Sequence, residues 1–410
     1  MGSDVRFARD AAFGDILSHQ LVEPVFQPVV ALADERPVGF EALARGPEGR
    51  FHSAADLFAA AVRAGRSAEL DWLCVKMAAL RYQEVDNAGC ALFVNINPDT
   101  LATDPPAELI EAWAELNARN DVVLELTERA VIEQPARLLN AVDDARRRSA
   151  RIALDDVGSE PASLVAMPLI NPDIIKLDRS IIQSRSNSWA VSQVVNAVLD
   201  DAQRQGSRIL AEGIERPEHV TVARSLGATL GQGWLFGRPG PLPHSVQPSE
   251  EQLPRVKPRH VSSESPFMVL AKTTELLSTS IDHFERVAAH VENQAAQTAN
   301  PGLLLVNLGD GGVDDEARIR QTYITNRGIE VFVFGTEVPR GGGGRIRFVP
   351  VAKDDPLARE RTILFVGSRY GSAAFARRRT ADTGEDYVDW GTCYNADAVI
   401  EAALALVHRL

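Results

Sequence analysis

The sequence predicts an α/β protein in which a (β/α)8 barrel with one antiparallel strand precedes a smaller C-terminal domain of the α/β or α+β class. Three observations lead to this prediction. Over the first 240 residues, short β-rich runs alternate with stretches whose apolar residues recur at helical spacing. A proline-rich segment follows, and a second set of β-rich runs fills the remainder. Repeated strand–helix units imply a parallel sheet, and seven or eight of them suggest a closed barrel.

Eight β-rich runs are expected to form the barrel. No helical pattern separates the first two, so they should form a hairpin, and one strand of the barrel is then antiparallel. The stretch AADLFAAAVRAGRSAELDWLCVKMAALRYQEV after the second run has helical spacing. The runs are PVFQPVV (24–30), PVGFEAL (37–43), CALFVNIN (90–97), VVLEL (122–126), RIALDD (151–156), DIIKLD (173–178), RILAEGI (208–214) and ATLGQGW (228–234).

Proline density marks a linker. The stretch PGPLPHSVQPSEEQLPRVKPRHVSSESPF contains seven prolines, too many for a helix or a central strand because each removes a backbone donor. We therefore expect a barrel domain over residues 1–240, a semi-stiff linker over 241–265 and a second domain over 266–410.

The second domain is expected to begin with a helix and to continue with strands. Its predicted strands are GLLLVNL (302–308), IEVFVFG (329–335), RIRFVPV (345–351) and RTILFVG (361–367), and a helix over ADAVIEAALALVHRL ends the chain. The predicted apolar stripe of the first helix consists of Leu277, Ile281, Phe284, Val287 and Val291.

Composition excludes several classes of function. The chain has 410 residues and a formal net charge of −13, so we expect neither duplex nucleic acid nor a membrane surface as a partner. Three cysteines without CxxC spacing argue against a disulfide framework and favour a reducing, cytoplasmic location. No apolar run is long enough for a membrane span, and the charged N-terminus does not read as a signal peptide.

Polar residues terminate most of the predicted barrel strands. The carboxyl ends of parallel barrel strands share one rim, which is where the active sites of barrel enzymes lie. Several carboxylates on one rim repel one another unless cations neutralise them. The residues concerned are Glu41, Asn95, Glu125, Asp155, Asp156, Lys176, Glu212 and Gln232.

Oxygen ligands select hard cations such as Mg²⁺, Mn²⁺ or Ca²⁺. Adjacent Asp155 and Asp156 suit a pair of ions that share a carboxylate, an arrangement that cleaves phosphodiesters. A turn at Gly158 is the alternative explanation of the two aspartates. Lys176, inside a carboxylate cluster, is either a residue that orients water or phosphate, or a structural cation that bridges the acids.

These segments resemble a known family. The succession FQPVV, GFEALARGP, LFVNIN, LELTE, LDDVG, IKLD, AEGIE and GQGWLFGRP is similar to EAL-domain cyclic-di-GMP phosphodiesterases over about residues 15–240. The resemblance implies a modified TIM barrel with an antiparallel strand. It also implies hydrolysis of cyclic di-GMP to 5′-pGpG with two Mg²⁺ or Mn²⁺ ions.

The resemblance further assigns roles to residues of this sequence. Glu41, Asn95, Glu125 and Asp155 would be metal ligands, and Asp156 would bind the second ion.

The remaining roles concern water, support and substrate. Glu212 and Lys176 would handle the attacking water, with the general base left open between them. Gln232 would support the metal site, and Glu128 would anchor the loop after Asp156. Substrate contacts would come from Gln27 and Arg45.

One loop departs from the family pattern. Active members usually carry a sequence like DFGTGYSSL where this chain has DDVGSEPASL, so Val157 replaces an aromatic residue and Pro161 stiffens the loop over 157–163. The alternative function is therefore a catalytically weak barrel that acts as a cyclic-di-GMP receptor or interaction module.

The C-terminal segments VFVFGTEVP, VPVAKDDPLARER and FVGSRYGSAAFARR resemble a DICT domain, a sensory module. This resemblance implies that the second domain receives a signal or a protein partner that the sequence does not identify. A homodimer of barrels is the expected assembly.

Overall fold

The computed structural model describes residues 12–101, 103–119, 122–127, 135–159, 163–184, 189–259, 261–297, 302–339, 346–368, 370–379 and 387–410. The chain forms two compact units. The first contains residues 1–130, 137–159 and 172–257, and the second contains residues 131–136, 160–171 and 258–410.

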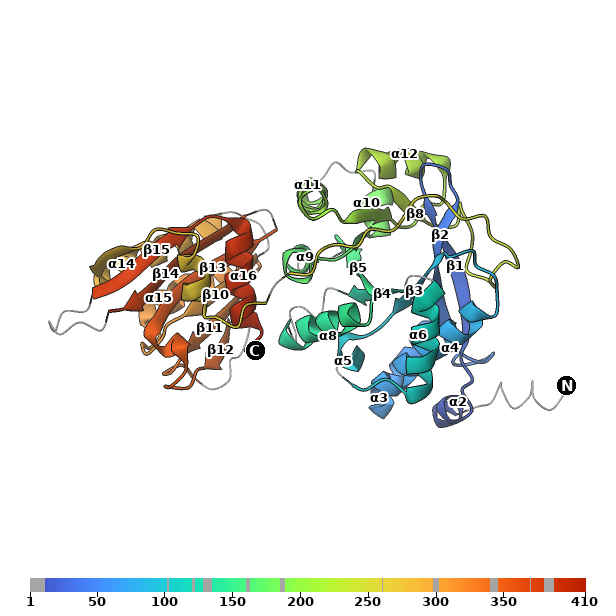
Figure 1. Cartoon of the computed structure of the whole chain (residues 1–410), viewed down its shortest axis with the longest axis horizontal. Coiled ribbons are helices and arrows are strands. Elements are labelled where there is room, and N and C mark those ends of the chain that lie inside the picture. The colour runs from blue at the N-terminus through green and yellow to red at the C-terminus, as the bar shows by residue number, and fades with distance from the viewer. Residues whose placement is uncertain are drawn as a thin grey trace. The chain divides into compact units, whose positions relative to one another are not determined.

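A closed barrel of eight strands forms the first unit (Figure 1). Strand β1 is antiparallel to both of its neighbours, β2 and β8, and the other neighbouring pairs are parallel. The predicted barrel with one antiparallel strand is thus confirmed. Its strands are β1 Glu23–Ala31, β2 Pro37–Arg45, β3 Ala91–Asn95, β4 Val122–Thr127, β5 Arg151–Val157, β6 Ile174–Leu177, β7 Arg208–Ala211 and β8 Leu230–Gln232.

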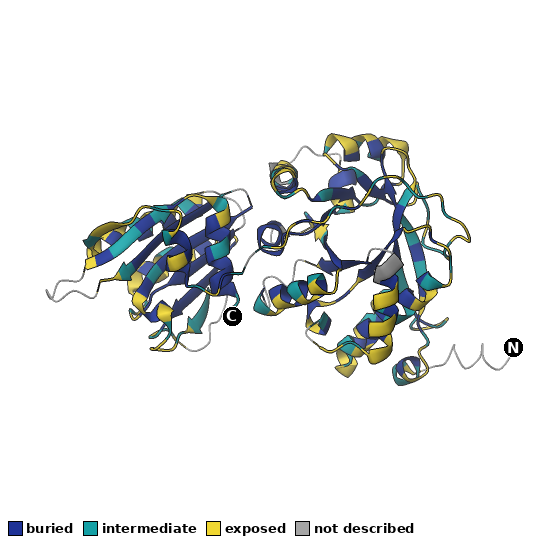
Figure 2. Ribbon diagram, viewed as in Figure 1, coloured by how far each residue is buried: buried dark blue, intermediate teal, exposed yellow. Residues whose placement is uncertain are grey.

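Helices surround this barrel, with buried faces toward the strands and exposed faces outward (Figure 2). The long helical stretch after β2 is divided by Gly65, whose φ of 65° lies in the left-handed region and ends the first helix. The helices are α2 Phe13–Ser18, α3 Ala54–Ala64, α4 Ser67–Gln83, α5 Pro98–Leu101, α6 Ala107–Arg119, α8 Pro135–Arg147, α10 Arg179–Gln183, α11 Trp189–Gln205 and α12 Pro217–Ser225.

Inward-facing side chains fill the barrel from its floor upward. Because side chains alternate along a strand, every second residue points into the barrel. The lower inward positions form one apolar cluster, which includes Phe93, Val123, Ala153, Ile174 and Leu210. This cluster is the floor on which the rim residues stand.

Part of the proline-rich segment closes the barrel floor. Leu253 belongs to the apolar cluster inside the barrel. Just after Leu253 in the chain, Arg151 Nε donates to the carbonyl oxygen of Pro254 at 2.8 Å, and the backbone N–H of Val256 donates to Asp173 Oδ1 at 2.6 Å. Arg151 opens β5 and Asp173 directly precedes β6. The segment therefore covers the end of the barrel opposite the strand termini that carry the polar residues.

The second unit is built on a seven-stranded mixed sheet in the order β12-β11-β10-β13-β14-β15-β9. Its strands are β9 Leu277–Ser280, β10 Gly302–Asn307, β11 Ile329–Gly335, β12 Ile346–Pro350, β13 Glu360–Gly367, β14 Gly371–Arg378 and β15 Tyr387–Cys393. Its helices are α9 Ser163–Ile170, α13 Pro266–Ala271, α14 Ile281–Gln297, α15 Asp315–Thr325, the 3₁₀ helix η1 Pro356–Arg359 and α16 Ala396–Val407.

Helices cover both faces of this sheet. Phe284 of α14 and Ile324 of α15 pack in one apolar cluster with strand residues such as Val306 and Phe365. On the opposite face, Phe375 of β14 makes an edge-to-face contact with Phe267 of α13 at 5.5 Å between ring centroids. The smaller α/β domain predicted from the sequence is confirmed.

The start of this unit corrects one prediction. Leu277 does not continue the apolar stripe of the helix, because it begins β9 and is 56% exposed. The following residues, Ser278 to Ser280, pair with β15, and α14 starts only at Ile281. Serine and threonine are weak helix formers, so pairing with an available strand decides their conformation. Strands β14 and β15 were not predicted either, since small and polar residues hide their apolar alternation.

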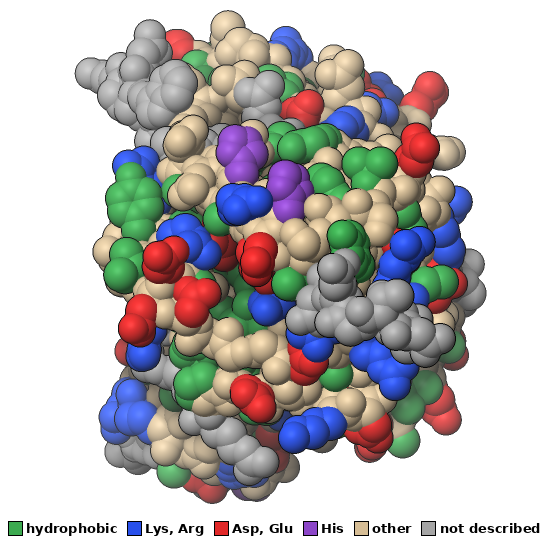
Figure 3. Space-filling model, turned by 90° about the vertical axis from the view of Figure 1, so that its left-hand side faces the viewer, with side chains coloured by type: hydrophobic (Ala, Val, Ile, Leu, Met, Phe, Trp, Pro, Cys, Tyr) green, Lys and Arg blue, Asp and Glu red, His purple; other side chains and the backbone are tan. Residues whose placement is uncertain are grey.

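All three cysteines are free, and none of the helices in the described ranges combines the length and apolar character of a membrane span. On the face seen in Figure 3, acidic and basic side chains are interspersed rather than gathered into a basic patch.

Replacing Leu253 with alanine should destabilise the barrel. The side chain is 8% exposed inside the barrel, so its loss should lower the free energy of unfolding by about 2–5 kcal/mol. Urea denaturation followed by circular dichroism would measure this. Val62→Ala, at a 70% exposed position on α3, is the matched control and should change stability by less than about 0.5 kcal/mol. Equal stability of the two variants would contradict the closed floor.

Candidate metal centre at the barrel rim

The rim residues continue the inward columns of the barrel. Glu125, Asp155 and Lys176 each lie two residues after an inward-facing apolar residue, and Glu212 and Gln232 follow the same rule. Period-two alternation therefore points the polar side chains to the barrel axis just above the apolar floor. The sequence-predicted cluster is brought together by this single geometric rule.

Asp155 and Asp156 need a further device, because consecutive residues of a regular strand point to opposite faces. The pairing of β5 with β6 shifts register between Leu154 and Val157, and Asp156 has a φ of 56°. The register shift marks a β-bulge. A left-handed conformation is uncommon for a residue other than glycine, although aspartate tolerates it. Both carboxylates consequently reach the rim, where ligand oxygens of Asp155, Asp156 and Glu212 lie within 4.8 Å of one another.

Lys176 occupies the centre of the carboxylates. Its Nζ lies 2.8 Å from Glu125 Oε1, 2.9 Å from Asp155 Oδ1 and 2.9 Å from Glu212 Oε1. Glu41 Oε2 is farther away, at 3.9 Å. The lysine is only 1% exposed, so water does not screen these interactions. A protonated Lys176 thus holds three carboxylates at fixed positions.

Two amides orient Glu41. Asn95 Nδ2 donates to Glu41 Oε1 at 2.8 Å, and Gln232 Nε2 donates to Glu41 Oε2 at 2.5 Å. Gln232 Nε2 also donates to Gln27 Oε1 at 3.3 Å, and Gln27 Nε2 donates to the carbonyl oxygen of Gly237 at 3.1 Å. Because each amide uses its nitrogen toward the acids, its oxygen is left for a cation.

Burial and mutual repulsion raise the pKa values of three of the acids. Burial raises the pKa of Glu125 well above its usual value, and repulsion from Glu41 adds to this against the attraction of Lys176. Burial likewise raises the pKa of Glu212 to about 8, with Lys176 opposing and Asp155 reinforcing the shift. The pKa of Asp156 is raised by burial and by its neighbour Asp155.

The pKa values of Glu41 and Lys176 are shifted so that the charged form of each side chain is favoured. Burial alone would raise the pKa of Glu41, but the charge of Lys176 and the hydrogen bonds from Gln232 and Asn95 lower it below the usual value. Burial would lower the pKa of Lys176, yet the surrounding carboxylates raise it well above the usual value. The lysine therefore stays protonated at neutral pH.

The donor set fits a hard divalent cation. Five carboxylates face one ammonium group, so negative charge remains in excess. Glu125 Oε2 and Gln232 Oε1 are buried and accept no hydrogen bond from any residue that the structure describes. Buried acceptors without partners are costly, and a cation with oxygen ligands would satisfy them.

One predicted substrate-binding residue lies outside this cluster. Arg45 ends β2 four residues beyond Glu41, and its Nη1 donates to the carbonyl oxygen of Ala44 at 2.8 Å. Glu128 and most of the loop after Ser159, including Pro161, lie outside the described residues.

The sequence reasoning missed an aromatic residue beside the rim. Trp234 follows Gln232 by two positions, is 52% exposed and carries the guanidinium of Arg238 at 3.9 Å from its ring centroid. An exposed tryptophan directly after a strand-ending Gln–Gly pair was the available signal.

Comparison with known proteins places this site in a family. The family model described as EAL domain matches residues 9–239, which is more than half of the chain. This chain belongs to the EAL domain family. The match covers every strand of the barrel, so all residues of the rim cluster lie within the EAL domain.

Two relatives of this EAL domain have names that refer to cyclic di-GMP phosphodiesterases. The cyclic di-GMP phosphodiesterase RocR of Pseudomonas aeruginosa is 32% identical over 155 residues, which is 37% of this chain and 40% of RocR. The probable cyclic di-GMP phosphodiesterase PdeB of Escherichia coli is 27% identical over 239 residues, 56% of this chain and 44% of PdeB. The chain thus spans less than half the length of either relative.

Among solved structures, Klebsiella pneumoniae BlrP1 in a calcium/cy-diGMP complex is 27% identical to this chain, with a TM-score of 0.48. The alignment covers 54% of this chain and 56% of BlrP1.

Replacing Lys176 with methionine should destabilise the metal-free protein by about 3–5 kcal/mol, because the carboxylates lose their buried counter-charge. Mn²⁺ should restore part of that stability, since it supplies positive charge to the folded state only. Thermal unfolding with and without Mn²⁺ would measure both effects. Lys353→Met, at an exposed position, is the control. A Lys176→Met protein as stable as the control, with no gain from Mn²⁺, would contradict the central role of the ammonium.

The affinity for Mn²⁺ should rise with pH. Glu212 has a pKa of about 8 in the metal-free protein, so the positive charge of a cation held beside it by Asp155 and Asp156 should drive off its proton below that pH. We expect the apparent Kd to fall by about tenfold per pH unit between pH 6 and 8 for each proton displaced, and to level off above. Calorimetric titration of the metal-free protein would measure it, and Glu212→Gln should flatten the slope. A pH-independent Kd would rule out this proton.

Proposed function

We propose that this chain is a cyclic di-GMP phosphodiesterase that opens one phosphodiester bond of the cyclic dinucleotide to give 5′-pGpG. The observation that carries the proposal is the convergence of five carboxylates, two amides and one buried lysine at a single rim of an EAL barrel. The names of RocR and PdeB support the choice of substrate.

Two Mg²⁺ or Mn²⁺ ions are the proposed cofactors. Such ions, when bound, polarise a phosphate and lower the pKa of water. The residues that would hold them are Glu41, Asn95, Glu125, Asp155 and Asp156. The bulge at Asp156 supports this assignment. It places Asp156 in a strained backbone conformation, and this conformation brings a second carboxylate to the rim.

Lys176 and Glu212 are the proposed proton-handling pair. The protonated Nζ of Lys176 is a donor that can orient the attacking water or a phosphate oxygen. The carboxylate of Glu212, 2.9 Å from Nζ, has a pKa of about 8, which suits a group that takes up a proton near neutral pH. We assign proton acceptance to Glu212 and orientation to Lys176, and Gln232 keeps Glu41 in place for both.

Substrate recognition is assigned to polar and aromatic groups beside the rim. Gln27 already belongs to the hydrogen-bond network, and Arg45 offers a planar fork that matches phosphate or a guanine edge. Trp234, with Arg238 against its ring, offers a flat face on which a guanine base can stack.

We further propose that residues 266–410 are a DICT-like sensory domain that regulates the barrel, and that the protein works as a cytoplasmic homodimer. The two sequence resemblances and the division into two compact units support this organisation.

Incubation of the full chain with cyclic di-GMP and Mn²⁺ or Mg²⁺, followed by chromatography, tests the function. The wild type should form 5′-pGpG, and Glu41→Gln and Asp155→Asn should each lower the rate by roughly 100-fold or more, since even loss of a group behind a metal ligand costs 10–100-fold. Glu69→Gln, on the outer helix α4, is the control and should leave the rate unchanged. Tight nucleotide binding without product in either metal would favour the receptor instead.

A further inference from the structure

The chain segment after the third barrel strand carries one of the proposed metal ligands. Strand β3 ends at Asn95, whose Nδ2 donates to Glu41 Oε1 at 2.8 Å. The barrel ladder holds the backbone one residue further, because the N–H of Ile96 donates to the carbonyl oxygen of Glu125 at 3.2 Å. The direction of the Asn95 side chain therefore depends also on how the residues beyond Ile96 are held.

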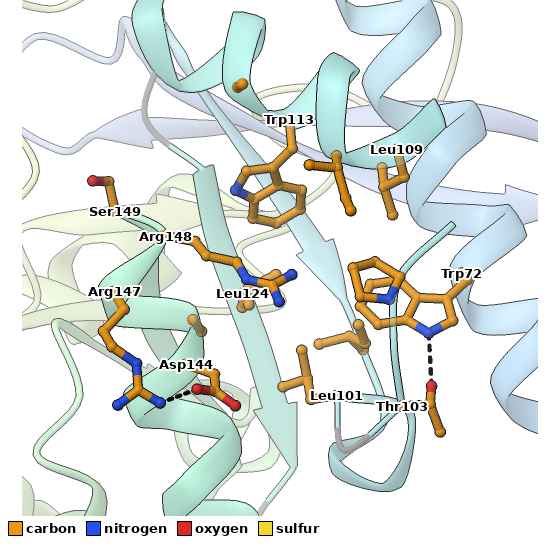
Figure 4. Close-up of a pocket in the computed structure, with 15 residues that line it drawn as sticks. Trp72, Leu101, Thr103, Leu109, Trp113, Leu124, Asp144, Arg147, Arg148 and Ser149 are labelled. Carbon is orange, nitrogen blue, oxygen red and sulfur yellow. Dashed lines mark hydrogen bonds and ion pairs between the residues drawn. The ribbon is translucent and has the colours of Figure 1, made fainter. Parts of the chain in front are cut away.

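Apolar packing around those residues is incomplete. A cavity of about 580 Å³ outside the strand wall is lined in part by Ile96, Leu101, Thr103 and Pro105 (Figure 4). Side chains that border open space have fewer neighbours to hold them than side chains in a close-packed core. The position of this segment therefore depends strongly on its hydrogen bonds.

Helix α4 supplies hydrogen bonds to the segment through two consecutive residues. Asp71 Oδ2 accepts hydrogen bonds from the backbone N–H of Asn97 at 3.3 Å and from Thr100 Oγ1 at 2.6 Å. Trp72 Nε1 donates to Thr103 Oγ1 at 2.8 Å, as Figure 4 shows. The segment from Asn97 to Thr103 is thus bound to α4 at both of its ends.

The burial of Asp71 has an energetic cost. The residue is 4% exposed, and burial raises the pKa of its carboxyl group, while the hydrogen bonds from Thr100 and Asn97 oppose that shift. A buried carboxylate destabilises a fold unless hydrogen bonds compensate for the lost contact with water. An apolar residue at this position of α4 would avoid that cost. The specific contribution of Asp71 is therefore its pair of hydrogen bonds to the segment.

We propose that Asp71 is a positioning residue of the metal centre. Its carboxylate fixes the backbone at Asn97, two residues after Asn95, and so keeps the Asn95 amide directed at Glu41. Asn95 and Glu41 are among the proposed metal ligands, so this inference rests on the proposed function. Without Asp71 the N–H of Asn97 and the hydroxyl of Thr100 lose this acceptor, and the segment that follows Asn95 is free to shift.

The geometry predicts which replacements of Asp71 are tolerated. Both hydrogen bonds go to the same oxygen, Oδ2, so asparagine can place its amide oxygen there and keep both. Leucine has the same branched outline and no acceptor, so both bonds are lost. Thr100→Val keeps the shape of that side chain and removes one of the two bonds. We thus expect the metal centre to depend on the acceptor oxygen rather than on the negative charge of Asp71.

Calorimetric titration of the full, metal-free chain with Mn²⁺ tests the proposal without measuring hydrolysis. Asp71→Leu should raise the Kd for Mn²⁺ by about tenfold, since loss of a group behind a metal ligand costs about 10–100-fold in affinity. Thr100→Val should raise the Kd by about threefold, because one hydrogen bond is lost. Asp71→Asn should keep the Kd within about twofold of the wild-type value, because both bonds remain.

Asp173→Asn is the matched control for a lost hydrogen bond at a buried aspartate. Asp173 is 2% exposed, and its two carboxylate oxygens accept from the N–H groups of Ile152 at 2.8 Å and Val256 at 2.6 Å. An amide cannot keep both of these bonds, and both lie at the floor of the barrel. This variant should lower the unfolding temperature and leave the Kd for Mn²⁺ unchanged.

Two results would overturn the proposal alone. They are an unchanged Kd in folded Asp71→Leu, and a Kd in Asp71→Asn as high as that in Asp71→Leu. Should Asp71→Leu not fold, an unchanged Kd in Thr100→Val decides against the proposal in the same way. A wild type that binds no Mn²⁺ would overturn the proposed metal centre and the role of Asp71 together.

Discussion

The rim depends on one buried ammonium group. Lys176 holds Glu125, Asp155 and Glu212 within 2.9 Å, and without it these largely buried carboxylates would repel one another. The pKa values of the acids show that this single charge is not enough, since Glu125 and Glu212 are both shifted toward the protonated form. The site is consequently short of positive charge in a way that divalent cations can correct.

The regular geometry of the barrel strands is enough to produce most of this arrangement. The same period-two alternation that buries Val123, Ala153 and Ile174 places an acid or the lysine two residues further along each strand. Core and site are successive layers of one interior. The floor is sealed by Leu253 from the proline-rich segment, which secures the apolar layer beneath the charges and separates them from water at the opposite end.

The strand wall presents different side chains on its inner and outer sides. Inward residues such as Glu125 build the proposed hydrolytic site, and the outward neighbour Leu124 borders a cavity with aromatic walls. Helices α6 and α8 contribute part of the walls of that cavity.

The sequence by itself determined the barrel, its antiparallel strand and the identity of the rim acids, because strand periodicity and the polar ends of strands are local patterns. Tertiary structure decided the rest. The bulge that turns Asp156 to the rim depends on pairing with β6, the short strand at Leu277 depends on the edge offered by β15, and Leu253 is buried only because the barrel floor is open to it. Each of these outcomes is set by a partner distant in the chain, and local propensity carries no information about such partners.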